Sequence, residues 1–308
     1  MALQINAAVC SNKGCVRSNN EDNFCLNGKF MQQEECDRGG LFETQAQAQS
    51  LVAVCDGMGG EEAGEEASLL AAQLCARYLE QKPIPTAQDK LRDFMFRGCR
   101  DVFAQAEKNE NHSGSTVALL IADDEGLHAA NMGDSRIYRL TTRSFEQISE
   151  DHTEMQRLLR RGQIKPSDVR HHPKRHMILQ YWGMPLSVAP FKPFMSHTIP
   201  CVHGEKYLLC SDGLTDMVEN DRIEQILRQS KTVGEIAQEL VDEALRNGGR
   251  DNVTAMVLEI LEDDPVQAAK TSAKPKKGLW FALLGVLLAA DIWVAYEFAQ
   301  KLFSWFAG

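Results

Sequence analysis

The sequence lacks the features of an exported, disulfide-bonded protein. It has nine cysteines, an odd number that cannot all form pairs within the chain. They are scattered through 308 residues, and no two form a Cys-x-x-Cys motif. This usage is typical of reduced thiols in a cytosolic compartment. Residues 1–20 hold no basic stretch followed by an apolar one, so we expect no secretory signal.

Two phosphate-binding motifs are also absent. None of the cysteines is followed six positions later by an arginine, which excludes enzymes that hold a phosphate in a Cys-x5-Arg loop. The P-loop pattern GxxxxGK[ST] does not occur. The formal net charge is −10. Because nucleic-acid binding favours a basic surface, we expect no nucleic-acid partner.

The first part of the chain is typical of one large α+β domain, and it spans residues 1–261. Strands are expected at Leu51–Cys55, Thr116–Ala122, Leu127–Asn131, Arg136–Leu140, Lys206–Cys210 and Val253–Leu261. Helices are expected at Glu61–Glu80, Ala87–Lys108, Asp221–Arg228 and Val233–Arg246. Strands cluster in runs with helices between them, which predicts helices packed on layered sheets.

The composition changes after residue 261. Residues 262–278 are polar, contain two prolines and are predicted to form a linker. Residues 279–299 are apolar and would span about 31 Å as a helix, close to the thickness of a hydrocarbon core. We therefore expect one transmembrane helix at 279–299 and a short tail at 300–308.

Asp291 is the objection to a membrane-spanning helix. A central aspartate costs about 3 kcal/mol, whereas the apolar residues around it return about 3–6 kcal/mol. An amphipathic helix lying in the interface is the alternative, although the segment has no single polar stripe. Lys274, Lys276 and Lys277 precede it. The positive-inside rule then predicts a single-pass inner-membrane protein with residues 1–261 in the cytoplasm.

Acidic residues recur beside predicted strand ends. They are Glu21, Asp22, Asp56, Asp134, Asp212 and Asp251. Each alone is more typical of a turn, but several carboxylates that converge would repel one another unless a cation lies between them. Oxygen ligands suit Mg²⁺ or Mn²⁺ better than zinc. Gly57 lets the backbone come close and offer a carbonyl oxygen.

These residues lie in six motifs that occur in a fixed order. The motifs are Arg17-Ser-Asn-Asn-Glu-Asp, Val54-Cys-Asp-Gly-Met-Gly-Gly, Gly114-Ser-Thr, Asn131-Met-Gly-Asp-Ser-Arg, Ser211-Asp-Gly-Leu and Gly249-Arg-Asp-Asn-Val-Thr. Over about residues 5–261 the chain resembles the metal-dependent protein phosphatase (type 2C) family in its bacterial form. The resemblance implies an α-β-β-α sandwich of two antiparallel sheets, with a metal centre between the sheets at one end.

The resemblance also implies a set of metal ligands. Asp56 would bridge two Mn²⁺ or Mg²⁺ ions. Asp212 and Asp251 would complete the first site, and Glu21 with the Gly57 carbonyl would hold the second. A third, weaker ion would be shared between Asp212 and a further ligand, Asp134.

The implied reaction is hydrolysis of phosphoserine or phosphothreonine in proteins by a water that the two metals activate. Arg17 would clamp the phosphate as a bidentate donor. Asp22 would orient the water, and Asn252 would support the ligands. The implied partners are phosphorylated proteins and a cognate serine/threonine kinase on the same membrane. The alternative is a catalytically weak, membrane-bound sensor that binds phosphoproteins, and the filled carboxylate positions argue against it.

The group that protonates the leaving oxygen stays open. Met58 stands where some members of the family have a histidine that is assigned as general acid. Methionine cannot donate a proton, so a metal-bound water or a nearby histidine would have to serve. His152 is one such candidate, although a structural role is more typical of a single histidine.

A basic segment, Arg157–His176, holds seven Lys or Arg residues against one acid, Asp168. It falls where the family has a flap beside the active site. The predicted substrate contacts are Arg160, Arg161, Arg170, Lys174 and Arg175. A solvated face without selectivity explains the charge equally well. The histidines at 171, 172 and 176 do not predict a transition-metal site, because no Cys or acidic partner lies at ligand spacing.

Overall fold

The computed structural model describes residues 4–36, 39–47, 49–59, 63–81, 83–187 and 190–261. The predicted linker, membrane helix and tail lie outside these residues. Within the described ranges, no helix is both long enough and apolar enough to cross a membrane.

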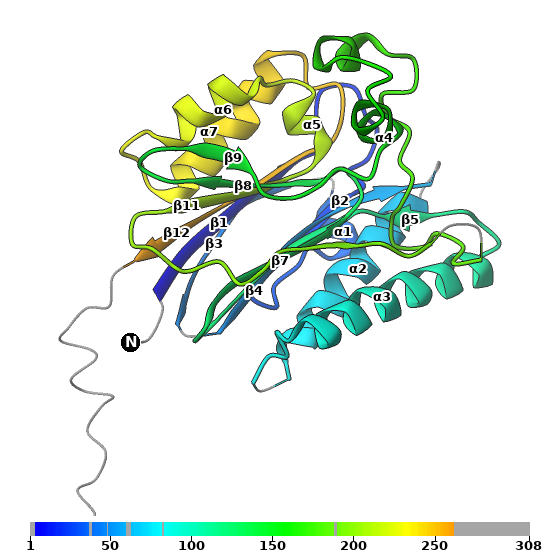
Figure 1. The fold of residues 1–308 in the computed structure, drawn as a ribbon, viewed down its shortest axis with the longest axis horizontal. Helices are drawn as coiled ribbons and strands as arrows, with labels where there is room; N and C mark the ends of the chain where they lie inside the picture. The colour runs from blue at the N-terminus through cyan, green and yellow to red at the C-terminus, as the bar shows by residue number, and fades with distance from the viewer. Residues whose placement is uncertain are drawn as a thin grey trace, which may run out of the picture. The chain divides into compact units, whose positions relative to one another are not determined.

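Two antiparallel sheets form the centre of the fold (Figure 1). The first has the order β3 (Gly40–Gln47), β1 (Gln4–Asn12), β12 (Val253–Leu261), β11 (Lys206–Cys210), β8 (Arg136–Leu140) and β9 (Phe145–Gln147). The second has the order β10 (Phe194–Met195), β7 (Gly126–Met132), β6 (Val117–Asp123), β4 (Ser50–Met58) and β2 (Asp22–Leu26), with β5 (Gly114–Ser115) paired to β4.

Helices cover the outer face of each sheet. The second sheet packs against α2 (Ala63–Leu79) and α3 (Gln88–Lys108), and the first packs against α6 (Asn220–Leu227) and α7 (Val233–Arg246) (Figure 1). A separate cluster of buried apolar side chains fills the space between the sheets. The predicted arrangement of two antiparallel sheets with helices outside them is therefore confirmed.

The sequence of β4 shows why this layering forms. Its side chains alternate between faces, as in any strand. Leu51 and Cys55 lie in the cluster under α2 and α3, whereas Val52 and Val54 lie in the cluster between the sheets. A strand that is covered on both faces is expected to be apolar throughout, and all five residues of Leu51–Cys55 are apolar.

The other elements of the described fold were not predicted. They are the helices α1 (Gln33–Cys36), α4 (Glu154–Arg160), η1 (Pro166–His171) and α5 (Asp212–Thr215), and the strands β1, β2, β3, β5, β9 and β10. β1 is rich in Ala, Asn and Ser, which have weak strand preference. It is a strand because β12 and β3 pair with it along both edges.

The topology brings the acidic motifs to one end of the sandwich. In an antiparallel sheet the end of one strand lies beside the start of its neighbour. Asp22 begins β2 and is paired with Asp56 near the end of β4. Val253, which follows the Gly249-Arg-Asp-Asn motif, is paired with Asn12 at the end of β1. Cys210, which precedes Asp212, is paired with Arg136 at the start of β8.

Candidate metal centre

Asp22 is a buried carboxylate with one oxygen occupied and one left open. Its Oδ2 accepts hydrogen bonds from Ser211 Oγ and Thr254 Oγ1, both at 2.7 Å. Its Oδ1 is buried and has no hydrogen-bond partner. Burial raises the pKa of Asp22 to about 7, although the two hydroxyl donors oppose this. A buried oxygen without a donor is costly, so it points to a ligand that the protein itself does not supply.

Asp56 lies at the centre of a group of carboxylates. Burial, followed by the charges of Asp22, Asp212, Asp134 and Asp251, raises its pKa well above the usual value. The pKa of Asp212 is raised in the same way, by burial and then by Asp134 and other acids. The fold therefore brings together carboxylates from five separate segments, as the motifs predicted.

Asp134 is the second carboxylate with an open oxygen. It is 7% exposed, and its Oδ1 has no hydrogen-bond partner. Burial and the charge of Asp151 raise its pKa to about 7. The turn before it is held by His152, whose backbone N–H donates to Gly133 O at 2.8 Å and whose Nδ1 accepts from Gly133 N at 3.3 Å.

Arg17 joins two of the predicted ligands at the mouth of the site. Its Nη2 donates to Asp251 Oδ2 at 2.8 Å, and its Nη1 lies 3.9 Å from Glu21 Oε2. The pKa of Glu21 is raised by burial, and the Arg17 guanidinium offsets only part of this effect. The Arg17 side chain is 47% exposed. The guanidinium is thus held beside the carboxylates while part of it faces solvent.

Asn252 forms hydrogen bonds with several segments of the site. Its Oδ1 accepts from Glu21 N at 2.8 Å, and its Nδ2 donates to Lys13 O at 2.9 Å and to Asn19 O at 2.8 Å. Its backbone N–H donates to Asp251 Oδ1 at 2.8 Å. The residue is 5% exposed. It fixes Glu21 and Asp251 relative to each other, which fits its predicted supporting role.

Two glycines allow the backbone to approach closely at this end. A Cβ at Gly57 would lie 2.0 Å from Gly64 O and 2.7 Å from Glu21 O. A Cβ at Gly213 would lie 1.9 Å from Asn252 O. Any side chain at either position would push apart the segments that carry Glu21 and Asp251.

These residues fit divalent cations of the Mg²⁺ or Mn²⁺ type. The donors are carboxylate oxygens, two of them buried without a partner, and the carboxylates raise one another's pKa. An ion would satisfy the open oxygen of Asp134 and offset the repulsion among the carboxylates. The residues placed to hold it are Glu21, Asp56, Asp134, Asp212 and Asp251. Their individual roles, and that of the Gly57 carbonyl, stay predictions.

A cleft of about 1020 Å³ extends from the carboxylates along the basic segment. Its lining includes three of the carboxylates, Asp134, Asp212 and Asp251, and two residues of the basic segment, Arg175 and His176. Arg250, which the motifs did not predict as a contact, lines it as well.

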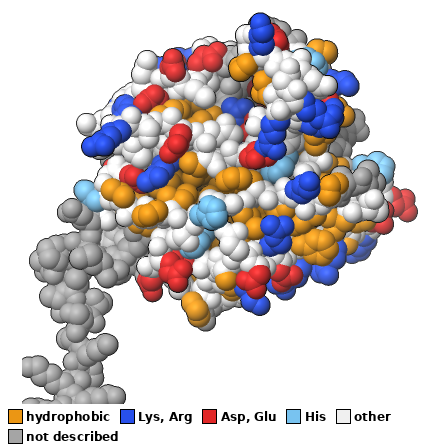
Figure 2. Space-filling view, viewed as in Figure 1, with side chains coloured by type: hydrophobic (Ala, Val, Ile, Leu, Met, Phe, Trp, Pro, Cys, Tyr) orange, Lys and Arg blue, Asp and Glu red, His pale blue; other side chains and the backbone are white. Residues whose placement is uncertain are grey.

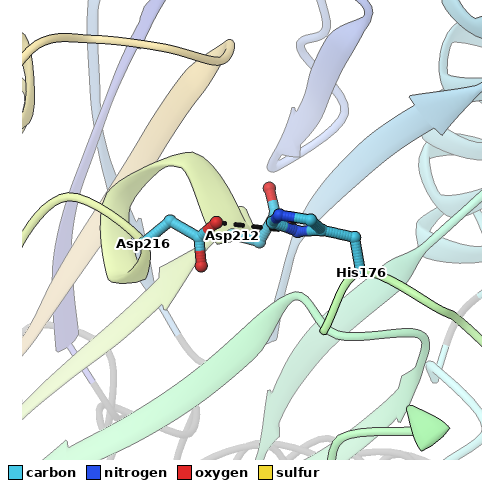
Figure 3. Close-up of side chains that lie close together, drawn as sticks. All are labelled: His176, Asp212 and Asp216. Atoms are coloured by element: carbon cyan, nitrogen blue, oxygen red, sulfur yellow. Dashed lines mark ion pairs between the residues drawn. The ribbon is translucent and has the colours of Figure 1, made fainter. Parts of the chain in front are cut away.

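His176 faces two acids that the sequence did not predict as its partners. Its Nδ1 lies 3.6 Å from Asp216 Oδ2 and 3.9 Å from Asp212 Oδ2 (Figure 3). The donor atoms of the three residues lie within 4.8 Å of one another. No acid lies at ligand spacing near His176 in the sequence, but the fold brings two acids beside it: Asp212, the first residue of α5, and Asp216, the C-cap residue of that helix.

The other residues of the basic segment that were predicted to contact substrate have different surroundings. Arg160 forms an ion pair with Glu150, and Arg161 and Lys174 are exposed. Arg175 lines the cleft. The side chain of Arg170 lies outside what the structure describes. Lys and Arg side chains gather on the surface formed by α4 and the segment that follows it (Figure 2).

His152 is placed as a structural residue. Its Nε2 donates to Lys192 O at 2.9 Å, and its Nδ1 accepts from Gly133 N. Burial lowers its pKa. Both ring nitrogens are therefore engaged with backbone groups, so the imidazole has no proton to offer a leaving group.

Comparisons with known proteins identify the family of the chain. Residues 32–248 match the family model for protein phosphatase 2C. The serine/threonine phosphatase stp of Listeria monocytogenes is 30% identical over 261 residues, which cover 83% of this chain and 96% of that protein. The serine/threonine protein phosphatase PstP of Mycobacterium tuberculosis is 32% identical over 266 residues, covering 86% of this chain and 46% of that protein.

Solved structures give the same result. The crystal structure of Mycobacterium tuberculosis PstP superposes with a TM-score of 0.70 at 32% identity, covering 85% of this chain and all of that one (100%). A catalytic domain of PstP in complex with two manganese ions superposes with a TM-score of 0.69 at 29% identity, with coverage of 85% and 100%. The chain belongs to the protein phosphatase 2C family, as its motifs predicted.

Proposed function

We propose that the protein hydrolyses phosphoserine and phosphothreonine in protein substrates at the carboxylate centre, with two bound Mn²⁺ or Mg²⁺ ions. The observation that carries the proposal is the pair of buried carboxylate oxygens, on Asp22 and Asp134, that have no partner in the protein. The names of the relatives stp and PstP support the substrate class. The PstP structure with two manganese ions supports the number of metals.

The ions would supply Lewis acidity, which activates water and neutralises charge on the phosphate oxygens. The protein's own groups do the positioning. Arg17 donates to phosphate oxygens, because its half-exposed guanidinium is held at the mouth by Asp251. Asp22, fixed by Ser211 and Thr254, presents its free oxygen to the attacking water. A third, weaker ion would lie at Asp134 and Asp212, where His176 and Asp216 add donors.

Phosphate release from a phosphothreonine peptide tests the activity. The full-length protein in detergent should hydrolyse the peptide with Mn²⁺ and lose the activity with EDTA. Asp212→Asn should be inactive, and Asp124→Asn, which changes an exposed acid away from the site, should behave as wild type. Turnover that EDTA does not affect would contradict the metal mechanism.

The same assay separates the enzyme from a sensor. A catalytically weak sensor would bind the phosphopeptide with Mn²⁺ present and release no phosphate. Binding measured by fluorescence anisotropy beside the phosphate assay distinguishes the two. The complete set of carboxylates favours the enzyme, because phosphopeptide binding alone needs only basic groups.

We also propose that residues 279–299 anchor the protein as a single-pass inner-membrane protein with its phosphatase domain in the cytoplasm. The support is the apolar sequence and the three preceding lysines. A cognate membrane-bound serine/threonine kinase is the expected partner, by analogy with the family alone. Alkaline carbonate extraction of membranes should retain the full-length protein in the pellet and release a variant truncated after residue 261.

A further inference from the structure

One histidine and two acids from different segments meet in the cleft. His176 belongs to the basic segment, whereas Asp212 is the first residue of α5 and Asp216 is its C-cap (Figure 3). One donor atom from each residue lies within 4.8 Å of the donor atoms of the other two. All three residues line the cleft. The fold therefore places an imidazole nitrogen and two carboxylates around one point beside the metal centre.

The distances in this group suit a shared cation better than hydrogen bonds. His176 Nδ1 lies 3.6 Å from Asp216 Oδ2 and 3.9 Å from Asp212 Oδ2. A hydrogen bond between nitrogen and oxygen is usually about 2.7–3.2 Å long. Two ligands that bind one zinc ion at about 2.0–2.2 Å lie about 3.3–3.6 Å apart in a tetrahedron. Both nitrogen–oxygen distances are thus close to the spacing that a metal ion needs.

The backbone fixes the ligands on both sides of the cleft. In α5, Asp216 N donates to Asp212 O at 2.8 Å. On the other side, the residue after His176 is tied to the start of α4, because Met177 O accepts from Glu154 N at 2.9 Å. Ligands that are held in place before binding lower the cost of binding an ion.

A buried carboxylate with an open oxygen lies beside the group. Asp134 is 7% exposed and lines the same cleft. Its Oδ1 has no hydrogen-bond partner. Burial and then the charge of Asp134 raise the pKa of Asp212, so the two carboxylates lie close together. Since a buried oxygen without a donor is costly, Asp134 points independently to a ligand at this place.

We propose that His176, Asp212 and Asp216 bind a divalent transition-metal cation, with Zn²⁺ as the best fit, next to the open oxygen of Asp134. The inference rests on the proposed function in one respect, since it gives ligands and a metal class to the third ion of that centre. Imidazole nitrogen suits zinc and other transition metals, whereas Mg²⁺ prefers oxygen ligands. Asp212 faces His176 with Oδ2, so its other oxygen stays available to the main centre.

The ligand from the basic segment gives the site a consequence for the cleft. An ion bound by His176 and by the two acids of α5 would tie the basic segment to that helix. Arg175, which directly precedes His176, lines the cleft as well. Binding of a transition metal would therefore fix the wall of the cleft beside the carboxylate centre.

Calorimetric titration with Zn²⁺ tests the site in the full-length protein, in detergent and with saturating Mg²⁺. The wild type should have a zinc site that is about a hundredfold weaker or absent in His176→Gln and in Asp216→Asn, because loss of even an outer supporting group costs about 10–100-fold. His176→Cys keeps a zinc ligand and should keep the site. Ca²⁺, which prefers oxygen ligands, should bind His176→Gln and the wild type equally.

His197→Gln and Asp221→Asn are the matched controls. His197 is an exposed histidine outside the basic segment, and Asp221 is an exposed acid that lines the same cleft. Both variants should bind Zn²⁺ as the wild type does. Circular dichroism checks that each variant folds, and Asp216→Asn carries the test if His176→Gln does not fold.

Trypsin cleavage of the basic segment gives a readout that does not depend on activity. Zn²⁺ at about 100 times its Kd should slow cleavage within Arg157–His176 by about tenfold or more in the wild type, because the ion stabilises the tied state. It should not slow cleavage in His176→Gln, which also controls for any effect of zinc on trypsin. Mass spectrometry locates the cuts.

The outcomes separate this inference from the proposed function. Equal zinc binding in the wild type, His176→Gln and Asp216→Asn would overturn the site and leave the zinc at the other carboxylates. Equal losses in the two controls would overturn it as well, since any surface histidine or acid would then serve. Zinc binding that leaves trypsin cleavage unchanged would overturn the tie to α5. If zinc binding depends on His176 but Mn²⁺ supports no phosphopeptide hydrolysis, the site stands and the proposed function fails.

Discussion

The acids at the two ends of strand β11 have opposite surroundings: one is paired with a cation, and the other lies among further acids. Before the strand, Glu205 is 6% exposed and accepts from Arg139 Nη2 at 2.7 Å and from Tyr207 Oη at 2.9 Å. After the strand, Asp212 begins α5 beside other acids that raise its pKa. Asp134, whose charge acts on it, has a buried oxygen without a partner.

The difference shows what each end is built for. At the Glu205 end, the protein supplies the cation itself, and the acid contributes to the folded structure. At the Asp212 end, the negative charges lie together, which destabilises the folded protein unless protons or cations bind. The fold thus gives up stability at one end and gains a binding site for external cations there.

Removing a central carboxylate should have the largest effect. Asp56→Asn should lower kcat/KM by about a thousandfold or more, equivalent to about 4 kcal/mol of transition-state stabilisation. It should also raise the melting temperature of the metal-free protein, because one of the mutually repelling charges is gone. Steady-state kinetics and calorimetry in EDTA measure the two effects. A variant that is both active and less stable would contradict the account.

Breaking the ion pair between Arg139 and Glu205 should lower stability and leave activity unchanged. Arg139→Met leaves Glu205 buried without its cation, and we expect the free energy of unfolding to fall by about 3 kcal/mol. The kcat of the folded protein should stay unchanged, since the pair is far from the carboxylate centre. Urea unfolding measures the loss, and Arg143→Met, at an exposed arginine, is the control. An equal loss in both variants would mean that the buried pair is not special.

The next largest effect should be a dependence of stability on pH that arises at the carboxylate centre. Burial raises the pKa of Asp22 and of Asp134 to about 7, above the unfolded value of 3.8. Groups with a raised folded-state pKa contribute stability that is present below the unfolded value and is lost as the pH rises through the folded value. The metal-free protein should therefore lose about 2.5 kcal/mol of stability for each of the two groups between pH 5 and 7.5. Asp134→Asn should flatten the curve, and saturating Mn²⁺ should reverse its slope.

The supporting residue should give the smallest effect. Asn252→Ala removes the hydrogen bonds to Glu21 N and to two loop carbonyls. Loss of such support for metal ligands costs about 10–100-fold in metal affinity or activity. We expect a weaker apparent affinity for Mn²⁺, measured by activity against metal concentration. Asn109→Ala, at an exposed asparagine of the α3 end, should leave that affinity unchanged.

The sequence allowed the acidic motifs to be predicted but not all of their neighbours. Asp56 and Asp212 follow apolar strands that can be recognised by pattern alone, so their place at strand ends could be foreseen. The donors to Asp22 could not, because Ser211 and Thr254 are 189 and 232 positions away and carry no local signal. The same holds for His176, because its acidic neighbours, Asp212 at the start of α5 and Asp216 just after this helix, do not belong to its own segment.

The fold shows the same limit. The long amphipathic helix α7 was predicted to its exact bounds, since its apolar face and the capping box of Thr232 and Glu235 are local signals. The strands β1 and β3 were missed because their sequences are only weakly apolar. They exist through pairing with neighbours, and this depends on the whole sheet.

Metal binding at the carboxylate end is the central claim, and the most direct measurement is a crystal structure of the full-length protein grown with Mn²⁺. The anomalous difference map should contain two manganese peaks, both within coordination distance of Asp56, with Asp212 and Asp251 on one ion and Glu21 on the other. An empty site at Asp56 at saturating Mn²⁺, or peaks only at surface acids away from it, would contradict the account.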